Sequence, residues 1–234
     1  MLFEKEHLDL FFVPLGLLVM FCYHLILLYR VLYLPYTTVI GFMNNDKKIW
    51  VDRIMQANKA NVNMALSVLS TNTSAATFLA SISLTLGSVI GAWLGNSSSN
   101  NLFENKLIYG DTRPATISIK YICLLTCFVL AFACFIQSTR YFIHATYLIT
   151  TPGNDIPPEI VKNTVVRGGD FWSIGLRSLY FAFNFLLWFF GPIPMFVSSI
   201  VIVIILHYLD TNSTPTPLYH QRFLGGQVGK RLDI

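Results

Sequence analysis

Charged side chains are scarce in this chain, and long stretches of it have none. Asp, Glu, Lys and Arg make up 12% of its 234 residues, whereas a typical soluble domain carries about 25%. None occurs in Leu10–Tyr29, Tyr121–Thr139, Ser178–Leu209 or the region 60–103. A bilayer core requires roughly 20 apolar residues in a helix. The composition therefore argues against a soluble protein and predicts an all-α membrane protein, a four-span transmembrane helical bundle.

Other absences exclude whole classes of activity. The four cysteines all fall within predicted spans, so a disulfide framework is not expected. The leader before Leu10 lacks the positive segment of a signal peptide, so the first span should stay in the protein. Basic residues are spread over the loops, which argues against nucleic acid as a partner. No catalytic, metal-binding or cofactor-binding pattern stands out, so we expect no enzyme, no metal and no cofactor.

The spans divide the chain into one transmembrane domain, residues 1–210, and a polar tail, residues 211–234. We place the first three spans at about 10–29, 75–94 and 121–139. The last, 178–209, is longer than one crossing needs and contains Gly191-Pro192-Ile193-Pro194. A helix kinked at 191–194 is the expectation there. A re-entrant hairpin of two half-spans is the alternative.

The distribution of basic residues predicts an orientation. The loops after the first and third spans hold nine Lys and Arg, against seven in the leader, the second loop and the tail. Positive residues stay cytoplasmic, so both termini should lie on the non-cytoplasmic side of a plasma membrane or endomembrane. Glycosylation sequons at Asn96 and Asn212 both fall on that predicted side.

Two loop segments carry helix signals. Pro35–Gly41 reads as an extended or looped link, and Asn44 begins a helix-start signal. The residues that follow predict an amphipathic helix in the cytoplasmic interface, anchored by Trp50. A second, short helix is predicted at 158–167, and Gly168-Gly169 should stop it.

Small and polar residues form a stripe along the second span, with steps of three and four residues. Its members are Ser67, Ser70, Ser74, Thr77, Ser81, Thr85, Ser88, Gly91 and Gly95. This spacing keeps one helix face aligned with a partner, and the glycines allow close approach. Either the stripe is a packing face whose hydroxyls bond to backbone carbonyls, or several copies ring a pore and the hydroxyls line it.

A few polar residues fall within or beside the spans. The intramembrane ones are His24, Gln137 and Asn184, and the interfacial anchors are Arg140 and Trp172 together with Trp50. Tyr23 and His24 could satisfy each other or reach headgroups, and Asn184 could bond across helices. His24 and His144 lie near the same predicted face, but this single pair is weak support for haem.

Three short motifs are distinctive: Tyr23-His24, the Pro-Tyr-Thr-Thr-Val-Ile-Gly segment Pro35–Gly41, and the Trp-Phe-Phe-Gly-Pro segment Trp188–Pro192. Over roughly residues 8–210 the chain resembles the plant integral membrane family catalogued as domain of unknown function 599. The resemblance implies a multi-span membrane protein and carries no activity with it.

These patterns favour a self-associating, channel- or transporter-like protein for an ion or small polar solute. The alternative is a non-catalytic accessory or scaffold subunit of a membrane complex, with the stripe docking a partner helix. The expected partners are the lipid bilayer and either further copies of the chain or another membrane protein.

Overall fold

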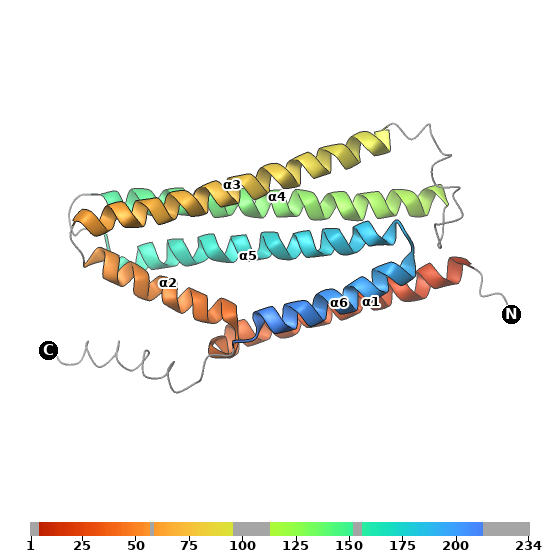
Figure 1. Cartoon of the computed structure of the whole chain (residues 1–234), viewed down its shortest axis with the longest axis horizontal. Helices are drawn as coiled ribbons and strands as arrows, with labels where there is room; N and C mark the ends of the chain where they lie inside the picture. The colour runs from red at the N-terminus through yellow and green to blue at the C-terminus, as the bar shows by residue number, and fades with distance from the viewer. Residues whose placement is uncertain (1–4, 57–58, 96–112, 152–155, 213–234) are drawn as a thin grey trace.

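The computed structural model describes residues 5–56, 59–95, 113–151 and 156–212, and in these ranges the fold is helical (Figure 1). In chain order the elements are α1 (Lys5–Tyr33), the 3-10 helix η1 (Pro35–Thr37), α2 (Val39–Met55), α3 (Lys59–Gly95), α4 (Pro114–Thr150), α5 (Pro158–Trp188) and α6 (Pro192–Asp210). The long helices lie roughly along one axis, and α2 crosses one end of the bundle obliquely.

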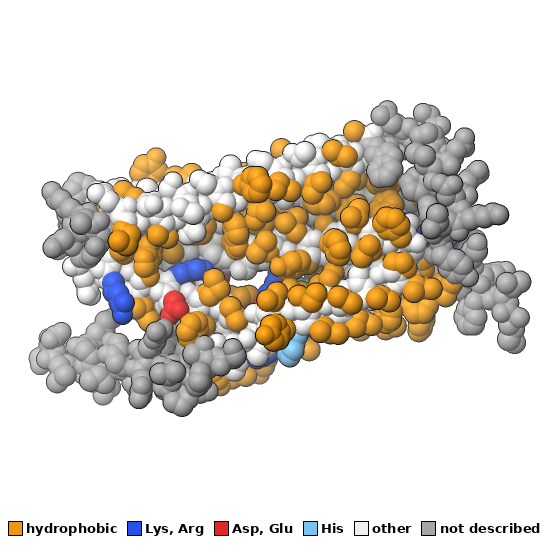
Figure 2. Space-filling view, viewed as in Figure 1, with side chains coloured by type: hydrophobic (Ala, Val, Ile, Leu, Met, Phe, Trp, Pro, Cys, Tyr) orange, Lys and Arg blue, Asp and Glu red, His pale blue; other side chains and the backbone are white. Residues whose placement is uncertain are grey.

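Four helical segments are long and apolar enough to cross a membrane: Leu8–Tyr33, Val62–Ala92, Pro114–Thr150 and Pro192–Asp210. Their outer faces carry large exposed apolar side chains, among them Phe11 and Leu25 on α1 and Ile204 on α6. Figure 2 shows such side chains over much of one face of the bundle. An apolar exterior on apolar helices suits lipid rather than water as the surrounding solvent. The predicted helical bundle with four membrane-length apolar helices is thus present.

The prediction of one kinked helix over 178–209 is wrong. The chain reverses direction between α5 and α6, and the two helices run antiparallel (Figure 1). Gly191 makes the reversal because its φ of 139° lies in a region that residues with a Cβ rarely adopt. Pro192 then starts α6, where its missing N–H costs no helical hydrogen bond. The re-entrant alternative is also wrong in its lengths, since α5 has 31 residues and α6 has 19.

This reversal changes the topology. The long helices pass along the bundle five times, so the start of α1 and the end of α6 lie toward opposite ends (Figure 1). The expectation that both termini lie on the non-cytoplasmic side stays a prediction. Asn212 donates to the Tyr36 backbone at the end where α1 finishes. Asn96 lies outside the described residues, so the placement of the two sequons on one outer side stays a prediction.

The bundle has two halves that differ in length and packing. At about 1.5 Å per residue, the 19 residues of α6 span about 28 Å, close to one bilayer core. Helices α3 and α4 have 37 residues each and reach about 55 Å. We call α1, α6 and the neighbouring parts of α3–α5 the membrane half. The α2 half consists of α2 and the segments 59–74, 140–150 and 158–171 that project past α6.

The α2 half has a hydrophobic core of its own. It is built from Val51 and Ile54 of α2, Leu69 of α3, Phe142 of α4 and Val161 of α5, together with smaller neighbours. Trp50 is half-buried and packs against this core, so its role as a lipid anchor is not supported by its surroundings. The amphipathic character predicted for this helix stays a prediction.

Helix α2 begins earlier than the sequence predicts. Thr38 caps it by accepting a hydrogen bond from the Gly41 N–H, so most of the expected link is helical. The end of α6 docks on the same turn, because the Asn212 N–H donates to the Thr37 carbonyl at 3.1 Å. The capped turn therefore joins the two halves of the molecule.

The predicted stop at Gly168-Gly169 is also wrong, since α5 continues to Trp188. Both glycines are buried where other elements approach closely. A Cβ at Gly168 would lie 2.8 Å from the Phe142 ring, and one at Gly169 would lie 2.0 Å from the Lys47 Nζ. Tertiary packing, rather than helix termination, explains why glycine stands at these positions.

Candidate functional site: a polar junction between the two halves

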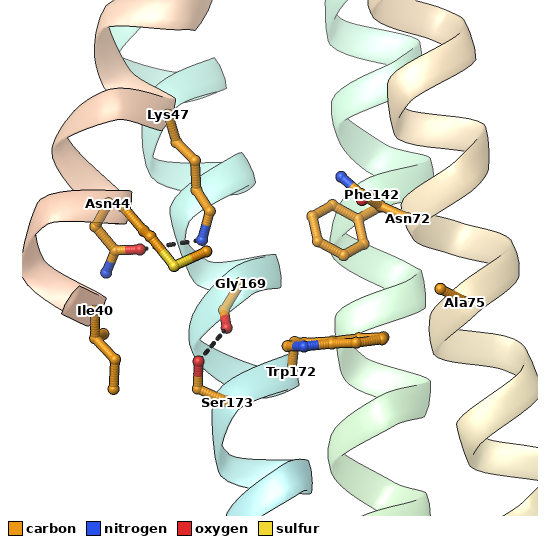
Figure 3. Close-up of a pocket in the computed structure, with 10 residues that line it drawn as sticks. Ile40, Asn44, Lys47, Asn72, Ala75, Phe142, Gly169, Trp172 and Ser173 are labelled. Atoms are coloured by element: carbon orange, nitrogen blue, oxygen red, sulfur yellow. Dashed lines mark hydrogen bonds between the residues drawn. The ribbon is translucent and has the colours of Figure 1, made fainter. Parts of the chain in front are cut away.

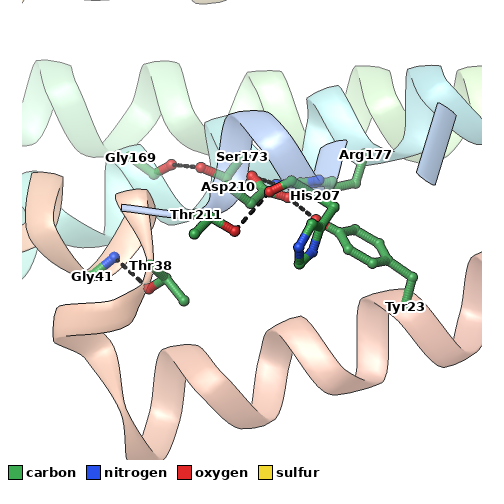
Figure 4. Close-up of polar contacts among 9 residues, drawn as sticks. All are labelled: Tyr23, Thr38, Gly41, Gly169, Ser173, Arg177, His207, Asp210 and Thr211. Atoms are coloured by element: carbon green, nitrogen blue, oxygen red, sulfur yellow. Dashed lines mark hydrogen bonds and ion pairs between the residues drawn. The ribbon is translucent and has the colours of Figure 1, made fainter. Parts of the chain in front are cut away.

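An ion pair between two helices meets a tyrosine hydroxyl from a third where α6 ends. The Arg177 guanidinium of α5 lies 2.5 Å from Asp210 Oδ1 of α6, and the Tyr23 hydroxyl of α1 donates to the other carboxylate oxygen at 2.6 Å (Figure 4). The Arg177 and Asp210 side chains are 17% and 10% exposed. A charge this deep is tolerated when it is paired and hydrogen-bonded, and here one carboxylate has two donors.

His24 lies beside this cluster. Its Nδ1 is 2.7 Å from the Met20 carbonyl, and its ring packs 5.1 Å from that of Phe181, one helical turn beyond Arg177. Tyr23 bonds Asp210, and its ring meets that of His24 edge-on at 5.4 Å, so the two do not satisfy each other's polar atoms. Within the described part of the chain, His24 Nε2 and Arg177 Nη1 are buried without a hydrogen-bond partner. Two such nitrogens at one junction are groups whose hydrogen bonds a water could complete.

A pocket of about 200 Å³ opens beside this junction, where the α2 half meets the membrane half (Figure 3). Helix α2 forms one wall, α3 the opposite wall, and α4 and α5 the floor. It is lined by Ile40, Met43, Asn44, Lys47, Asn72, Ala75, Phe142, Gly169, Trp172 and Ser173. Aromatic rings and alkyl chains thus face an ammonium, two amides and a hydroxyl in one cleft.

Lys47 is the cationic group of the pocket. Its Nζ donates to Asn44 Oδ1 at 3.1 Å, and the Asn44 amide donates to Asp170 at 2.9 Å. Burial lowers the pKa of Lys47 from its ordinary value, and the Asp170 carboxylate offsets this only in part. The ammonium can approach α5 so closely because Gly169 has no side chain.

A second lysine of the α2 half is fully paired. Lys162 of α5 lies 2.7 Å from Asp52 of α2 and 2.9 Å from Glu159. Burial by itself would lower the pKa of Lys162, but the hydrogen bonds and charges of the two carboxylates raise it above its ordinary value. The two lysines therefore occupy opposite electrostatic environments.

The stripe on α3 points away from the rest of the protomer. Its exposed members are Ser67, Ser70, Ser74, Thr77, Ser81, Thr85, Ser88 and Gly91; Gly95 ends the helix, and its surroundings are outside the described set. The hydroxyls of Thr77, Ser81, Thr85 and Ser88 each donate to the backbone carbonyl four residues earlier, at 2.8–3.0 Å. The face that packs on α4 consists of other residues, such as Ala76 and Ala80.

The remaining predicted residues have varied surroundings. Asn184 is fully buried and bonds across helices, because its amide donates to Ser199 of α6 at 2.8 Å and its oxygen accepts from Ser198. Gln137 is half-buried, Arg140 is exposed, and Trp172 is a half-buried wall of the pocket inside α5. The role of Trp172 as an interfacial anchor stays a prediction.

Sequence reasoning found His24 and missed its charged neighbours, and it did not connect Lys47 with Gly169. One signal was present: Arg177 and Asp210 immediately flank the charge-free stretch Ser178–Leu209. A hairpin brings the two ends of such a stretch together, so flanking charges of opposite sign are natural partners. The pocket gave no comparable signal, since its lining comes from four helices.

The fold and the site define a multi-pass helical membrane protein with a polar junction at one end of its membrane half. The family described as "Protein of unknown function, DUF599" matches residues 11–215, and the chain belongs to this family. No curated protein and no solved structure matches it. Among the described residues, no group of three or more His, Cys, Asp or Glu is placed to hold a metal ion.

Proposed function

We propose that this protein self-associates through the outward stripe of α3 and that the associated stripes line a conduit for an ion or a small polar solute. The observation that carries the proposal is the direction of the stripe. All of its members whose surroundings are described are exposed, although the opposite face of the same helix packs tightly on α4.

The outward face suits a second helix better than lipid. Small side chains let two helix backbones approach closely, and a Cβ added at Gly91 would meet nothing within 4 Å in the protomer. Each hydroxyl that bonds its own backbone keeps oxygen lone pairs for a neighbouring helix or a passing solute. Against lipid tails, a row of eight small or polar positions would bury little apolar area.

We propose an orientation for the bundle from the distribution of its basic residues. The α2 half carries Lys47, Lys48, Arg53, Lys162 and Arg167, and Figure 2 shows the visible basic side chains gathered toward it. The described residues near the opposite end include three basic ones, Lys5, Arg113 and Lys120. Because positive residues stay cytoplasmic, we place the α2 half in the cytoplasm and the start of α1 on the far side of a plasma membrane or endomembrane.

Disulfide cross-linking tests the contact. In a background with the four native cysteines replaced by alanine, Thr77→Cys or Ser81→Cys should give covalent dimers or larger species in native membranes. Leu130→Cys on α4 and Ile204→Cys on α6, both on exposed apolar faces, are the matched controls and should not. Equal cross-linking at all four positions would mean random collision and would remove the proposal.

Conductance tests the conduit. The purified chain in a planar bilayer should give unitary currents, and Thr77→Leu or Ser81→Leu should abolish them. Thr126→Leu is the control, since Thr126 is also exposed and donates to the carbonyl four residues earlier, but lies on α4. Currents that survive the α3 substitutions would exclude this stripe as the lining.

A non-catalytic accessory or scaffold subunit is the second candidate. The same outward stripe would then dock a helix of a different membrane protein. Purification in mild detergent discriminates the two, because a stoichiometric foreign membrane protein favours the scaffold and a homo-oligomer favours the conduit.

A further inference from the structure

We propose that the pocket between α2 and α3 binds the phosphate of an anionic lipid headgroup, with Lys47 as the charged ligand and the lipid's apolar part against Met43 and Trp172. This site is independent of the α3 stripe and does not require self-association.

The donors in the pocket suit a phosphate. An ammonium acts as a point charge toward phosphate, and phosphate oxygens accept several hydrogen bonds at once. Lys47 supplies the charge, while the Asn44 and Asn72 amides and the Ser173 hydroxyl line the same cleft (Figure 3). Ser173 currently donates to the Gly169 carbonyl at 3.0 Å, and this bond can be exchanged for one to a ligand.

The ammonium gains more from a ligand than an exposed lysine would. Lys47 is half-buried, its hydrogen bond goes to the neutral Asn44 oxygen, and the Asp170 carboxylate acts on it only as a nearby charge. Burial lowers the pKa of Lys47 and the Asp170 charge opposes this only in part, which agrees with a positive charge whose one hydrogen bond goes to a neutral oxygen. An anion entering the pocket would supply the missing compensation.

The apolar lining and the depth of the pocket argue for a lipid. Phe142 and Gly169 form a buried floor, and the exposed Met43 and Asn72 stand at the rim, on α2 and α3. The pocket lies next to the end of α6, whose length of about 28 Å places that end near the edge of the bilayer core. Headgroup phosphates occur at this level, and Trp172 is a residue type enriched there.

Titration calorimetry of the full chain in uncharged-detergent micelles tests the site. Dioctanoyl phosphatidic acid should bind, and dioctanoyl phosphatidylcholine, which has the same tails on a zwitterionic head, should bind at least about tenfold more weakly. Titration with inorganic phosphate distinguishes a lipid headgroup from free phosphate as the ligand. If inorganic phosphate binds more weakly than dioctanoyl phosphatidic acid, the apolar wall contributes to binding. If the two bind equally, the pocket is a site for free phosphate, and the lipid part of the proposal is overturned.

Two substitutions locate the ligand. Lys47→Met removes the charge and keeps most of the side-chain stem, and Gly169→Ala keeps the charge but places a Cβ where Nζ lies. Each should weaken phosphatidic acid binding about tenfold or more, because a hydrogen bond to a charged group is lost. Lys48→Met, at an exposed position of the same helix, should leave the Kd unchanged.

Three results would overturn the proposal: an equal loss in Lys48→Met, an unchanged Kd in Gly169→Ala, or equal binding of the two lipids. Size-exclusion elution shows whether each variant is folded. If Lys47→Met or Gly169→Ala does not fold, Asn72→Asp replaces it. That change lies at the exposed rim, adds a charge that repels phosphate, and should weaken binding to a similar extent. Unchanged binding in a folded Asn72→Asp would likewise contradict the site.

Discussion

The membrane half and the α2 half use their polar residues in opposite ways. In the membrane half, charges and amides are buried against one another, as in Arg177 with Asp210 and Asn184 with two serines. In the α2 half, a pocket leaves Lys47 with one neutral oxygen, although Lys162 on the neighbouring helix has two carboxylates. The first arrangement stabilises a helix junction, and the second leaves a charge available to a ligand.

The difference follows from the surrounding solvent. Where lipid surrounds the helices, every polar group needs a partner inside the protein, because lipid supplies none. In the placement proposed above, water can satisfy surface groups where α3–α5 project past α6, and the local core there is an apolar cluster around Phe142 and Val161. A lysine whose positive charge is only partly compensated is therefore expected in the α2 half and not among lipid-facing helices.

The largest effect should come from breaking the buried ion pair. Asp210→Ala leaves the Arg177 guanidinium unpaired in a 17% exposed position and removes the Tyr23 acceptor. We expect a loss of about 3–5 kcal/mol in the free energy of unfolding, measured by denaturant titration in mixed micelles. The double variant Arg177→Met with Asp210→Ala should be less destabilised than Asp210→Ala alone. A double variant that is no better would show that the buried charge is not the cause.

A smaller effect should distinguish glycines on the inner and outer faces of the bundle. At Gly175 an added Cβ would lie 2.8 Å from the ring of Phe135, which is fully buried, so Gly175→Ala should cost about 1–3 kcal/mol. At Gly91, where nothing lies within 4 Å, alanine should instead gain up to about 1 kcal/mol of helix propensity. Unfolding of both variants in the same micelles checks this, and equal shifts of the same sign would contradict the model.

Removing the two lysines of the α2 half should have different consequences. Lys162→Met loses pairs with partly exposed carboxylates and should lower the free energy of unfolding by about 0.5–1 kcal/mol. Lys47→Met removes an ammonium that burial penalises and should leave stability unchanged or raise it. Thermal unfolding of the two variants beside the wild type measures this difference. A loss in Lys47→Met as large as that in Lys162→Met would mean that Lys47 is also a structural ion pair.

The smallest effect concerns pH. The pKa of Lys47 is lower in the folded chain than its ordinary value of 10.5, so the folded state binds fewer protons in the window just below that value. Stability should therefore rise with pH there, and Lys47→Met should remove this contribution. For Lys162 the sign is reversed, since its raised pKa gives stability that is present below 10.5 and is lost at higher pH. Identical pH slopes for the wild type and Lys47→Met would contradict the prediction.

Local patterns predicted what depends on local physics. The apolar spans predicted membrane-length helices, because a helix satisfies its own backbone whatever it packs against. The stripe on α3 was found from its helical spacing, and the possible cross-helix bond of Asn184 from the cost of leaving an amide unpaired. Two helix ends were predicted wrongly, a start at Asn44 and a stop at Gly168-Gly169. In both cases tertiary neighbours, and not the local sequence, set the roles of these residues.

The sequence by itself determined that this is an all-helical membrane protein with few internal charges, since hydropathy acts residue by residue along the chain. Only the tertiary structure decided that the last charge-free stretch is a hairpin, which pairs Arg177 with Asp210 and puts the start of α1 and the end of α6 at opposite ends of the bundle. It also decided that Lys47 lies over Gly169, 122 positions further along the chain, in a pocket lined by four helices. Such contacts depend on how helices pack against one another. Hydrophobic periodicity shows which face of a helix is buried but does not identify the helix that packs on it.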